Sequence, residues 1–303
     1  MDYVLTANAL SKRYGQFKAL DGLTMKIPKG AIYGLVGKNG AGKTTLIRLV
    51  CGLQNPSSGS YTLFGKSTSG GIEEARRRMG AVVETPSIYT DMTAEDNLKM
   101  QYRVLGLPSF DDIPELLRLV GLENTGKKKA GKFSLGMRQR LGIAVALAGS
   151  PDFLVLDEPV NGLDPQGIIE IRELLLKLNR ERQITVLISS HILDELSRLA
   201  THYGFIDSGR MVREISAEEL EAAGRKCVRV RVTDTGALAQ VLDGLGLEYK
   251  IISDSQADIF GQVNVSQLVL ALSERGCEVS SMHERDESLE SYYVSLVGGE
   301  AHE

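Results

Sequence analysis

The segment GKNGAGKTT, residues 37–45, constrains the fold more than any other part of the sequence. It fits the pattern G-x-x-x-x-G-K-[ST] at Gly37, Gly42, Lys43 and Thr44, between a strand-like apolar run and a helix-like run. Glycines let backbone N–H groups approach phosphate oxygens, and the start of the next helix adds partial positive charge. Lys43 can reach the β- and γ-phosphates, and the Thr44 hydroxyl can bind Mg²⁺. The segment therefore predicts a site for a nucleoside triphosphate with Mg²⁺.

A second segment, FLVLDEP at residues 153–159, supplies acidic groups that suit such a site. Its four apolar residues predict a buried strand, and Asp157 stands at the carboxyl end, where it can hold Mg²⁺ through its coordination shell. Glu158 follows directly and can take a proton from a water that attacks the γ-phosphate. An acidic pair after a strand is often simply exposed to solvent. Together with the phosphate loop, however, this pair indicates nucleotide hydrolysis.

Strand-like and helix-like patterns alternate over the first two thirds of the chain. Short apolar runs predict buried strands at AIYGLVG, FLVLD and ITVLISS, and further strands are predicted at YVLTANAL, LTMKIP and YTLFG. Helices are predicted at KTTLIRLVCG, LGMRQRLGIAVALAG and PQGIIEIRELLLKLNRE, and Thr93 is a candidate cap for another. This alternation predicts an α/β domain at residues 1–216, with a mostly parallel sheet covered on both faces. Residues 86–148 form a predicted helical subdomain within it.

The sequence pattern changes near Arg225. CVRVRVT alternates strictly like a half-buried strand, and the following segments predict the order β-α-β-β-α-β. That order is typical of the split βαβ sandwich. We therefore predict a small C-terminal α+β accessory domain at residues 225–303, in which the sequence reveals no chemistry.

The overall composition excludes several classes of protein. The net charge of −4 provides no bulk positive field to favour nucleic acid, and the short basic runs at residues 76–78 and 127–129 are expected to be solvated surface. The three cysteines, Cys51, Cys227 and Cys277, share no ligand-like spacing and fit inert thiols in a reducing cytoplasm. The N-terminus lacks a signal-peptide pattern, and the most apolar run has about half the length of a membrane span. We expect a cytoplasmic protein that does not cross a membrane by itself.

The segment FSLGMRQRLG, residues 133–142, reads as a turn that leads into a helix, and in isolation it would be an ordinary capped helix start. It occurs, however, in a fixed order with GKNGAGKTT, FLVLDEP, NGLD and SSH. These motifs resemble those of the ATP-binding cassette (ABC) transporter family, and the resemblance covers about residues 2–215. It implies a P-loop NTPase cassette fold, with antiparallel strands beside the mostly parallel sheet, and it implies ATP with Mg²⁺ as ligands.

The resemblance also implies a partner. In the ABC family two cassettes face each other head to tail, and ATP lies between the phosphate loop of one and the signature segment of the other. Ser134 and Gly136 would then face the γ-phosphate of the partner's nucleotide, at a helix start whose dipole suits an anion. Asp164, in NGLDP, resembles the family residue that crosses this interface. The partner is a second copy of the chain or another paired cassette.

Two segments depart from the usual family pattern. The signature reads SLGM at residues 134–137, where the family has Ser-Gly-Gly-Gln. In GAVVETPSIY, Glu84 stands where the family normally has a glutamine that faces Mg²⁺ or water. A carboxylate keeps the oxygens but loses the amide donors, and it adds negative charge near Glu158 that mainly Mg²⁺ is expected to balance. These departures and the C-terminal domain resemble the cassette subunits of bacitracin-type and lantibiotic exporters.

Two further positions resemble family residues that contact the nucleotide. His191, in SSHIL, matches the histidine that senses the γ-phosphate, and Tyr14 matches the aromatic residue that stacks on adenine. A lone histidine after a strand is usually structural and an exposed tyrosine is common, so these two roles rest on the resemblance. The predicted site then has catalytic residues (Glu158, His191, Lys43, Glu84), metal-binding residues (Thr44, Glu84, Asp157) and nucleotide-binding residues (Tyr14, Gly37, Asn39, Gly40, Gly42, Lys43, Thr44, Thr45, Ser134, Gly136, Asp164).

These features favour the ATP-hydrolysing subunit of an ABC exporter, which powers a separate membrane permease and lies at the cytoplasmic face of the membrane. The exported substrate would be an antibiotic or a bacteriocin-like peptide, and the loop at residues 84–88 with the helices after it would receive the permease. Ribosome-remodelling cassette proteins usually carry two phosphate loops, whereas this chain has one. DNA-repair and chromosome-structure ATPases would insert long coiled-coil heptads between the nucleotide motifs, and no sustained heptads occur here. A soluble nucleotide-dependent regulator without transport stays open as the alternative.

Overall fold

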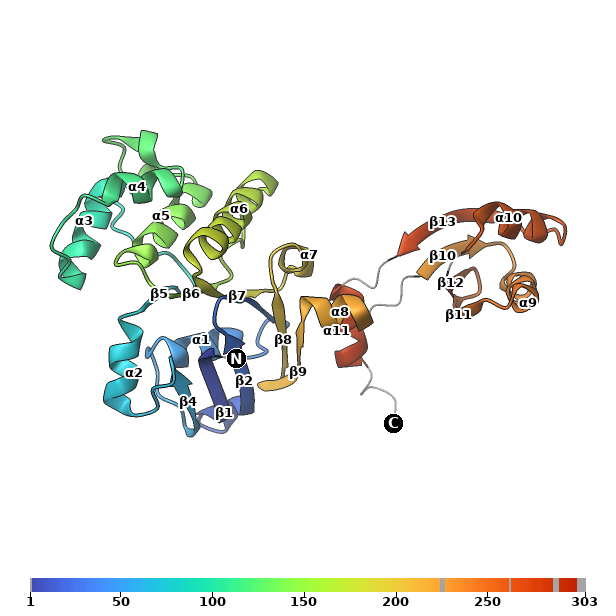
Figure 1. Ribbon diagram of the computed structural model, residues 1–303, viewed down its shortest axis with the longest axis horizontal. Helices are drawn as coiled ribbons and strands as arrows, with labels where there is room; N and C mark the ends of the chain where they lie inside the picture. The colour runs from blue at the N-terminus through green and yellow to red at the C-terminus, as the bar shows by residue number, and fades with distance from the viewer. Residues whose placement is uncertain (1, 224–226, 262, 286–288, 299–303) are drawn as a thin grey trace. The chain divides into compact units, whose positions relative to one another are not determined.

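The computed structural model describes residues 2–223, 227–261, 263–285 and 289–298 (Figure 1). The chain divides into two compact units, Met1–Ala217 and Glu218–Glu303. We propose that these units correspond to the predicted domains 1–216 and 225–303, of which residues 1, 225, 226, 262, 286–288 and 299–303 lie outside the described residues. Within the described part of the chain, no helix combines the length and the apolar character that a membrane span needs.

A six-stranded sheet forms the centre of the first unit, as the predicted alternation of strands and helices requires. Its order is β5 (Met79–Val82), β6 (Phe153–Asp157), β7 (Thr185–Ser190), β3 (Ile32–Val36), β8 (His202–Asp207) and β9 (Arg210–Ser216). All neighbours are parallel except β8 and β9, which pair antiparallel. Every residue of β3, β6 and β7 is buried, which explains their continuous apolar character.

An antiparallel three-stranded sheet packs beside it, in the order β2 (Phe17–Pro28), β1 (Tyr3–Tyr14) and β4 (Ser58–Leu63). One hydrophobic core joins the two sheets and encloses helix α1 (Lys43–Val50), with members that include Leu10, Met25, Leu46 and Phe153. The phosphate-loop helix is therefore anchored from both sheets. The α/β cassette fold predicted from the sequence, with antiparallel strands beside a mostly parallel sheet, is confirmed.

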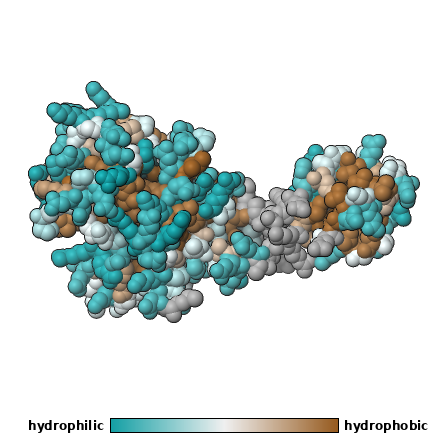
Figure 2. Space-filling model, turned by 45° about the horizontal axis from the view of Figure 1, so that its top comes forward, coloured by the Kyte–Doolittle hydropathy of each residue, from teal (hydrophilic) through white to brown (hydrophobic). Residues whose placement is uncertain are grey.

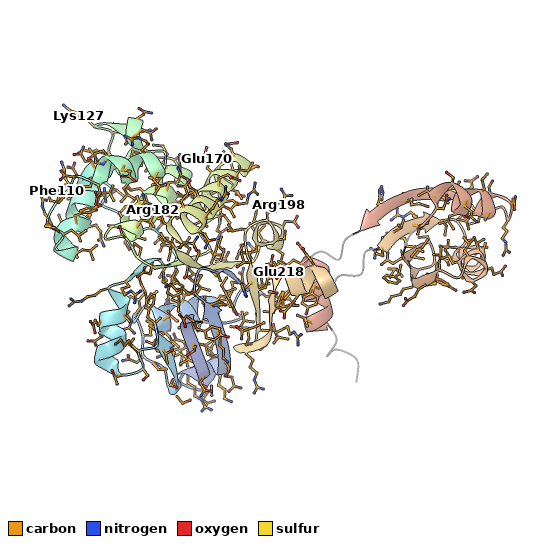
Figure 3. The ribbon with its side chains drawn as sticks, in the orientation of Figure 1. Phe110, Lys127, Glu170, Arg182, Arg198 and Glu218 are labelled. Carbon is orange, nitrogen blue, oxygen red and sulfur yellow. The ribbon has the colours of Figure 1, made fainter. Side chains whose placement is uncertain are left out.

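The predicted helical subdomain contains α3 (Ala94–Leu105), α4 (Ile113–Leu119) and α5 (Leu135–Leu147), with short 3₁₀ turns at Glu123–Thr125 and Ala130–Lys132. Thr93 caps α3 as predicted, because its hydroxyl accepts from the Asp96 N–H and the Asp96 carboxylate accepts from the Thr93 N–H. Helix α6 (Pro165–Arg182) connects β6 to β7. Its last residue is Arg182 (Figure 3). The guanidinium of Arg182 donates to Glu115 of α4 at 2.9 Å and so links the helices.

Several elements of the first unit were not predicted, namely α2 (Ser69–Arg76), α7 (Leu193–Ser197) and the strands β5, β8 and β9. The expectation that residues 76–78 are merely solvated surface is wrong for Arg76. Its guanidinium is partly buried, donating to the Val50 carbonyl at 3.2 Å and to the Tyr61 hydroxyl at 2.5 Å. The run at residues 127–129 is exposed, as expected. A short helix, α7 (Leu193–Ser197), follows the carboxyl end of β7.

The second unit carries the predicted β-α-β-β-α-β order. Its elements are β10 (Cys227–Val232), α9 (Thr235–Leu245), β11 (Glu248–Ser253), β12 (Gln256–Phe260), α10 (Val265–Ser273) and β13 (Val279–Arg285), preceded by α8 (Ala217–Ala223) and followed by α11 (Leu289–Gly298). The sheet order is β11-β12-β10-β13, antiparallel throughout. Hydrophobic residues cover much of the visible face of this unit in Figure 2, and its exposed apolar side chains include Ile251, Ile252 and Leu270.

Candidate nucleotide-binding site

The phosphate loop joins the end of β3 to the start of α1, as its pattern predicted. Two of its glycines are required by close packing. A Cβ at Gly37 would lie 2.5 Å from the Ile206 carbonyl oxygen, and one at Gly42 would lie 2.7 Å from that of Ala19. Gly42 also has φ of 111°, a conformation that residues with a Cβ rarely adopt. The loop is thus held tightly against the neighbouring backbone.

Lys43 is the first residue of α1, and its side chain folds back over the loop. It is 5% exposed, and its ammonium group donates to the Gly37 carbonyl at 2.6 Å and to the Lys38 carbonyl at 3.3 Å. A buried ammonium needs such acceptors because water no longer solvates it. The charge is therefore kept beside the loop backbone, where phosphate oxygens would bind.

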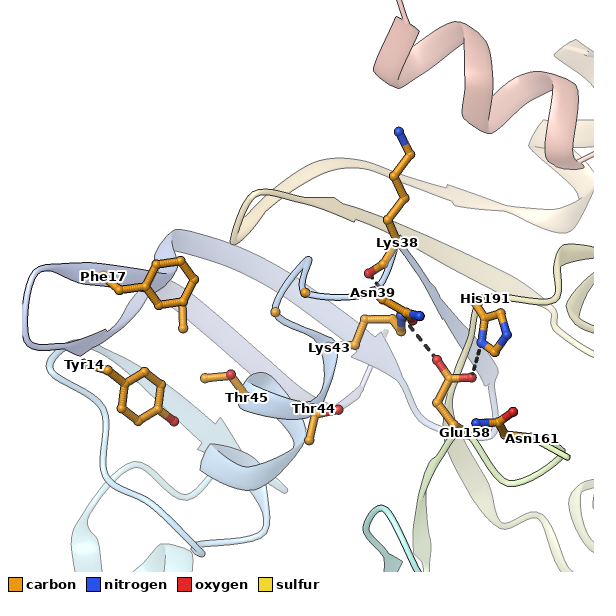
Figure 4. Close-up of a pocket in the computed structure, with 13 residues that line it drawn as sticks. Tyr14, Phe17, Lys38, Asn39, Lys43, Thr44, Thr45, Glu158, Asn161 and His191 are labelled. Atoms are coloured by element: carbon orange, nitrogen blue, oxygen red, sulfur yellow. Dashed lines mark hydrogen bonds and ion pairs between the residues drawn. The ribbon is translucent and has the colours of Figure 1, made fainter.

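An open cavity of about 320 Å³ lies in front of this loop (Figure 4). Tyr14 and Phe17 lie at one end of it, and Glu158 and His191 lie at the other. The predicted residues that line it are Tyr14, Asn39, Gly40, Gly42, Lys43, Thr44, Thr45, Glu158 and His191. The structure thus brings segments from four distant parts of the sequence to one cavity. Gly37, Asp157, Glu84, Ser134, Gly136 and Asp164 do not line it.

Glu158 is the charged centre of this cavity. One carboxylate oxygen, Oε1, lies 3.2 Å from the Lys43 ammonium nitrogen, and the other, Oε2, lies 2.7 Å from Nδ1 of His191. Its side chain is 19% exposed, so water reaches it while Lys43 and His191 fix its direction. The backbone at Glu158 has φ of 49°, which is unfavourable for a residue with a Cβ. Such local strain at a polar cavity is typical of functional residues.

Asp157 lies directly behind Glu158, at the buried carboxyl end of β6. It is 2% exposed, and its Oδ1 accepts from the hydroxyl of Ser189 at 2.6 Å. Ser189 is the register partner of Asp157 on β7. This serine was not singled out from the sequence, because its role depends on the pairing of strands that lie far apart in the chain.

Glu84 lies outside the cavity, just after β5, and has φ of 62°. Its Oε1 accepts from the guanidinium of Arg48, a residue of α1, at 2.5 Å. From the sequence, mainly Mg²⁺ was expected to balance this negative charge. The structure adds a protein partner, because the Arg48 cation offsets the Glu84 charge beside the phosphate-loop helix.

Tyr14 ends β1 at the tight turn into β2, and the residue is 43% exposed. Its hydroxyl donates to Oε1 of Gln54, and the Lys12 ammonium lies 5.4 Å from the ring centroid. These two contacts fix a ring whose face can stack on a base. Phe17, Lys38 and Asn161 also line the cavity and were not predicted. The turn sequence YGQF, which sets two aromatic rings side by side in the hairpin, was the available signal for Phe17.

The signature segment lies at a second cavity, of about 340 Å³, lined by Ser134, Leu135, Gly136, Arg140, Gly162, Leu163, Asp164, Gln166, Gly167 and Glu170. Ser134 caps α5 by accepting from the Met137 N–H at 3.2 Å, and Asp164 caps α6 by accepting from the Gly167 N–H at 3.1 Å. Two helix starts therefore converge here, and their dipoles suit an anion. The Arg140 cation lies beside them and pairs with Glu170 at 3.5 Å. Within one chain, the signature segment and the phosphate loop line different cavities.

Comparison with known proteins finds extensive similarity. Residues 20–161 match the model of the ABC transporter family. The chain is 39% identical to the bacitracin transport ATP-binding protein of Bacillus licheniformis over 99% of both chains. It is 43% identical to a lantibiotic transport ATP-binding protein of Streptococcus pyogenes over 70% of this chain and 90% of that protein. A solved ATP-binding subunit of an ABC transporter superposes with a TM-score of 0.65 at 29% identity, over 73% of this chain and 92% of that one.

Proposed function

The chain belongs to the ATP-binding subunits of ABC transporters, and from this premise we propose that it powers the export of antibiotic or bacteriocin-like peptides through a separate membrane permease. It is an ATPase, in keeping with its family. The similarity over nearly the whole length to a bacitracin transport ATP-binding protein supports the substrate class. The observation that carries the chemistry is the Glu158 carboxylate, held between Lys43 and His191 at the phosphate cavity.

In the proposed reaction, Glu158 is the general base. Its carboxylate takes a proton from a water that attacks the γ-phosphate in line with the leaving ADP. Lys43 leaves Glu158 for the β- and γ-phosphate oxygens, which offer a stronger negative charge to its ammonium. His191 holds the opposite oxygen of Glu158 through Nδ1 and orients the carboxylate before the nucleotide binds. Because a neutral imidazole carries one N–H, His191 would release Glu158 when it donates toward the γ-phosphate. These groups together stabilise charge on the transferred phosphoryl group.

The donor set fits Mg²⁺ that arrives with the nucleotide. Thr44 and Asp157 offer hard oxygens, which suit an ion usually held by one or two carboxylates together with substrate phosphates. Among the described residues, no cluster of three or more His, Cys, Asp and Glu side chains forms a self-contained metal site. The ion would neutralise phosphate charge when bound. Glu84 is a third candidate ligand, and Arg48 would have to release its carboxylate first.

We further propose that two cassettes enclose ATP between them. Tyr14, Asn39, Gly40 and Thr45 would bind the nucleotide from one side, with the remaining loop residues. The partner would contribute Ser134, Gly136 and Asp164 from its second cavity. The support is that one chain carries both halves at different cavities, so only a second cassette could bring them together.

The proposed site of action is the cytoplasmic face of the membrane, where the loop at residues 84–88 contacts the permease. Coexpression with a candidate multispan permease, followed by membrane fractionation, tests this. We expect the chain in the membrane fraction only when that protein is present, and cells that export peptide antibiotic only with both. A chain that stays in the soluble fraction and leaves antibiotic sensitivity unchanged would instead indicate a nucleotide-dependent regulator.

A further inference from the structure

Ser189 contacts both acidic residues of the site through a single hydroxyl group. Its Oγ donates to Oδ1 of Asp157 at 2.6 Å and accepts from the backbone N–H of Glu158 at 2.9 Å. The side chain is fully buried, with an exposed fraction of 0%. A buried hydroxyl of this kind has no water to exchange with, so its two hydrogen bonds are fixed in direction.

The first bond sets the orientation of Asp157. Its carboxylate is 2% exposed and would be costly to bury without a donor. With Oδ1 occupied by Ser189, the second oxygen, Oδ2, is left for other ligands. The side-chain rotamer of a candidate Mg²⁺ ligand is therefore selected by the serine rather than by solvent.

The second bond holds the backbone of Glu158. This residue has φ of 49°, in the left-handed region that a Cβ disfavours. Its N–H points at Ser189 and also approaches the Ser189 carbonyl at 3.2 Å. These bonds keep the strained conformation that turns the carboxylate toward Lys43 and His191.

The next residue, Ser190, has a different structural role, although the sequence pattern SS does not distinguish the two serines. Ser190 accepts from the Ile192 N–H at 2.9 Å and so stabilises the turn that carries His191. Ser189 alone of this pair reaches the acidic residues. The strand register, Asp157 opposite Ser189, accounts for that difference.

We propose that Ser189 is a positioning residue for ATP hydrolysis, which aligns the Asp157 carboxylate for the divalent cation and the Glu158 carboxylate for the attacking water. This assignment rests on the proposed ATPase site. It predicts that removal of the hydroxyl lowers turnover while ATP itself still binds, because Ser189 lies behind the two acids and does not line the nucleotide cavity.

The test compares Ser189→Ala with Thr185→Val. Thr185 lies at the other end of β7 and is 1% exposed. Its hydroxyl also accepts a hydrogen bond from a backbone N–H, that of Gly30 at 2.9 Å. Ser189→Ala loses the two hydrogen bonds of one buried hydroxyl and Thr185→Val loses one, so Thr185→Val controls for the removal of a buried hydroxyl from the same strand. Only Ser189→Ala removes the contact with the acids.

For Ser189→Ala, we expect the Mn²⁺ concentration that half-saturates the protein with a non-hydrolysable ATP analogue to rise about tenfold, measured by electron paramagnetic resonance. Metal-free binding of a fluorescent ATP analogue should stay unchanged. Hydrogen exchange at the Glu158 amide should accelerate, and kcat should fall with little change in KM. Thr185→Val should leave all of these quantities near their wild-type values.

Unchanged Mn²⁺ affinity together with unchanged exchange at Glu158 in Ser189→Ala would overturn the assignment. An equal response of Thr185→Val would also overturn it, because the effect would then be general to the strand. If the unmodified chain fails to hydrolyse ATP, the proposed function fails instead. The metal-binding and exchange measurements do not need turnover and still decide the role of Ser189.

Discussion

The guanidinium of Arg48 lies 2.5 Å from Oε1 of Glu84, and this pair joins the helix of the phosphate loop to the segment that leads into the helical subdomain. Both side chains are partly exposed, at 35% and 53%, so the pair adds little to stability. The pair matters because Arg48 and a bound cation would compete for the same carboxylate. A Glu84 carboxylate held by Arg48 is less available to a cation beside the nucleotide.

This competition predicts opposite effects of two substitutions on the Mg²⁺ dependence of ATPase activity. Glu84→Gln removes an anionic oxygen, so the Mg²⁺ concentration for half-maximal activity should rise about two- to tenfold. Arg48→Ala frees the carboxylate, so the same quantity should fall. Steady-state ATPase rates over a Mg²⁺ titration measure both. If neither variant shifts the titration, glutamate at this position is incidental.

Replacing the proposed general base should separate binding from turnover. Glu158→Gln keeps the size of the side chain and can still contact His191, but it cannot accept a proton. We expect kcat to fall about 10²–10⁴-fold while ATP affinity stays within a few-fold of the wild type. Phosphate release and nucleotide binding are measured on the same preparation. A variant with full turnover would remove Glu158 from the role.

Two glycine substitutions should have contrasting effects. At Gly136 the nearest atom to an added Cβ is a methyl carbon of Leu163 at 3.8 Å, so Gly136→Ala should fold normally. At Gly42 the added Cβ would lie 2.7 Å from a backbone oxygen, and Gly42→Ala should cost about 2 kcal/mol of stability or more.

Urea denaturation measures the stability of both variants. The ATP-driven association of two chains measures whether Gly136 acts at the interface. Because Gly136 is proposed to face the partner's γ-phosphate, Gly136→Ala should weaken association without lowering stability. Normal association of the folded Gly136→Ala variant would argue against a partner role for the signature segment.

Cys51 should be chemically inert in the folded protein. Burial disfavours the thiolate and raises the pKa of the Cys51 thiol to about 12. Only the thiolate is alkylated, so we expect reaction with iodoacetamide at about pH 8 to be at least 10²-fold slower than in the unfolded chain. The pKa of Cys51 in the folded chain lies above that of an exposed thiol. The contribution of this buried thiol to the free energy of unfolding is therefore fully present below about pH 8.5 and is lost as the pH rises toward 12. Peptide mapping of the labelled cysteines measures the rate, and equal labelling in both states would contradict the burial.

The features that could be predicted from the sequence are those that short-range patterns encode. The phosphate loop, the buried strand ahead of Asp157 and the cap at Thr93 all depend on residues within a few positions of one another. Helix α2 was missed because it begins with Ser-Gly-Gly, which has poor helix propensity. Strand β5 is only four residues long, and its Gly80 is required because an added Cβ would lie 1.9 Å from the Ala146 carbonyl oxygen.

The contacts that refine the site depend on pairing between distant segments. Ser189 meets Asp157 only through the register of β7 on β6, and Arg48 meets Glu84 only after β5 joins the sheet edge. No local pattern in the sequence encodes either contact. The family resemblance identified Glu84 as unusual, but it did not identify the arginine that balances its charge.

The central claim is that ATP binds between two cassettes, each of which supplies half of the site. The most direct test is the molar mass of the Glu158→Gln chain in solution, alone and with its permease, with and without Mg-ATP. We predict a monomer of 33.0 kDa without nucleotide and an ATP-dependent species of twice that mass, which Ser134→Ala weakens. A chain that binds ATP and yet stays monomeric, alone and on the permease, would contradict the account.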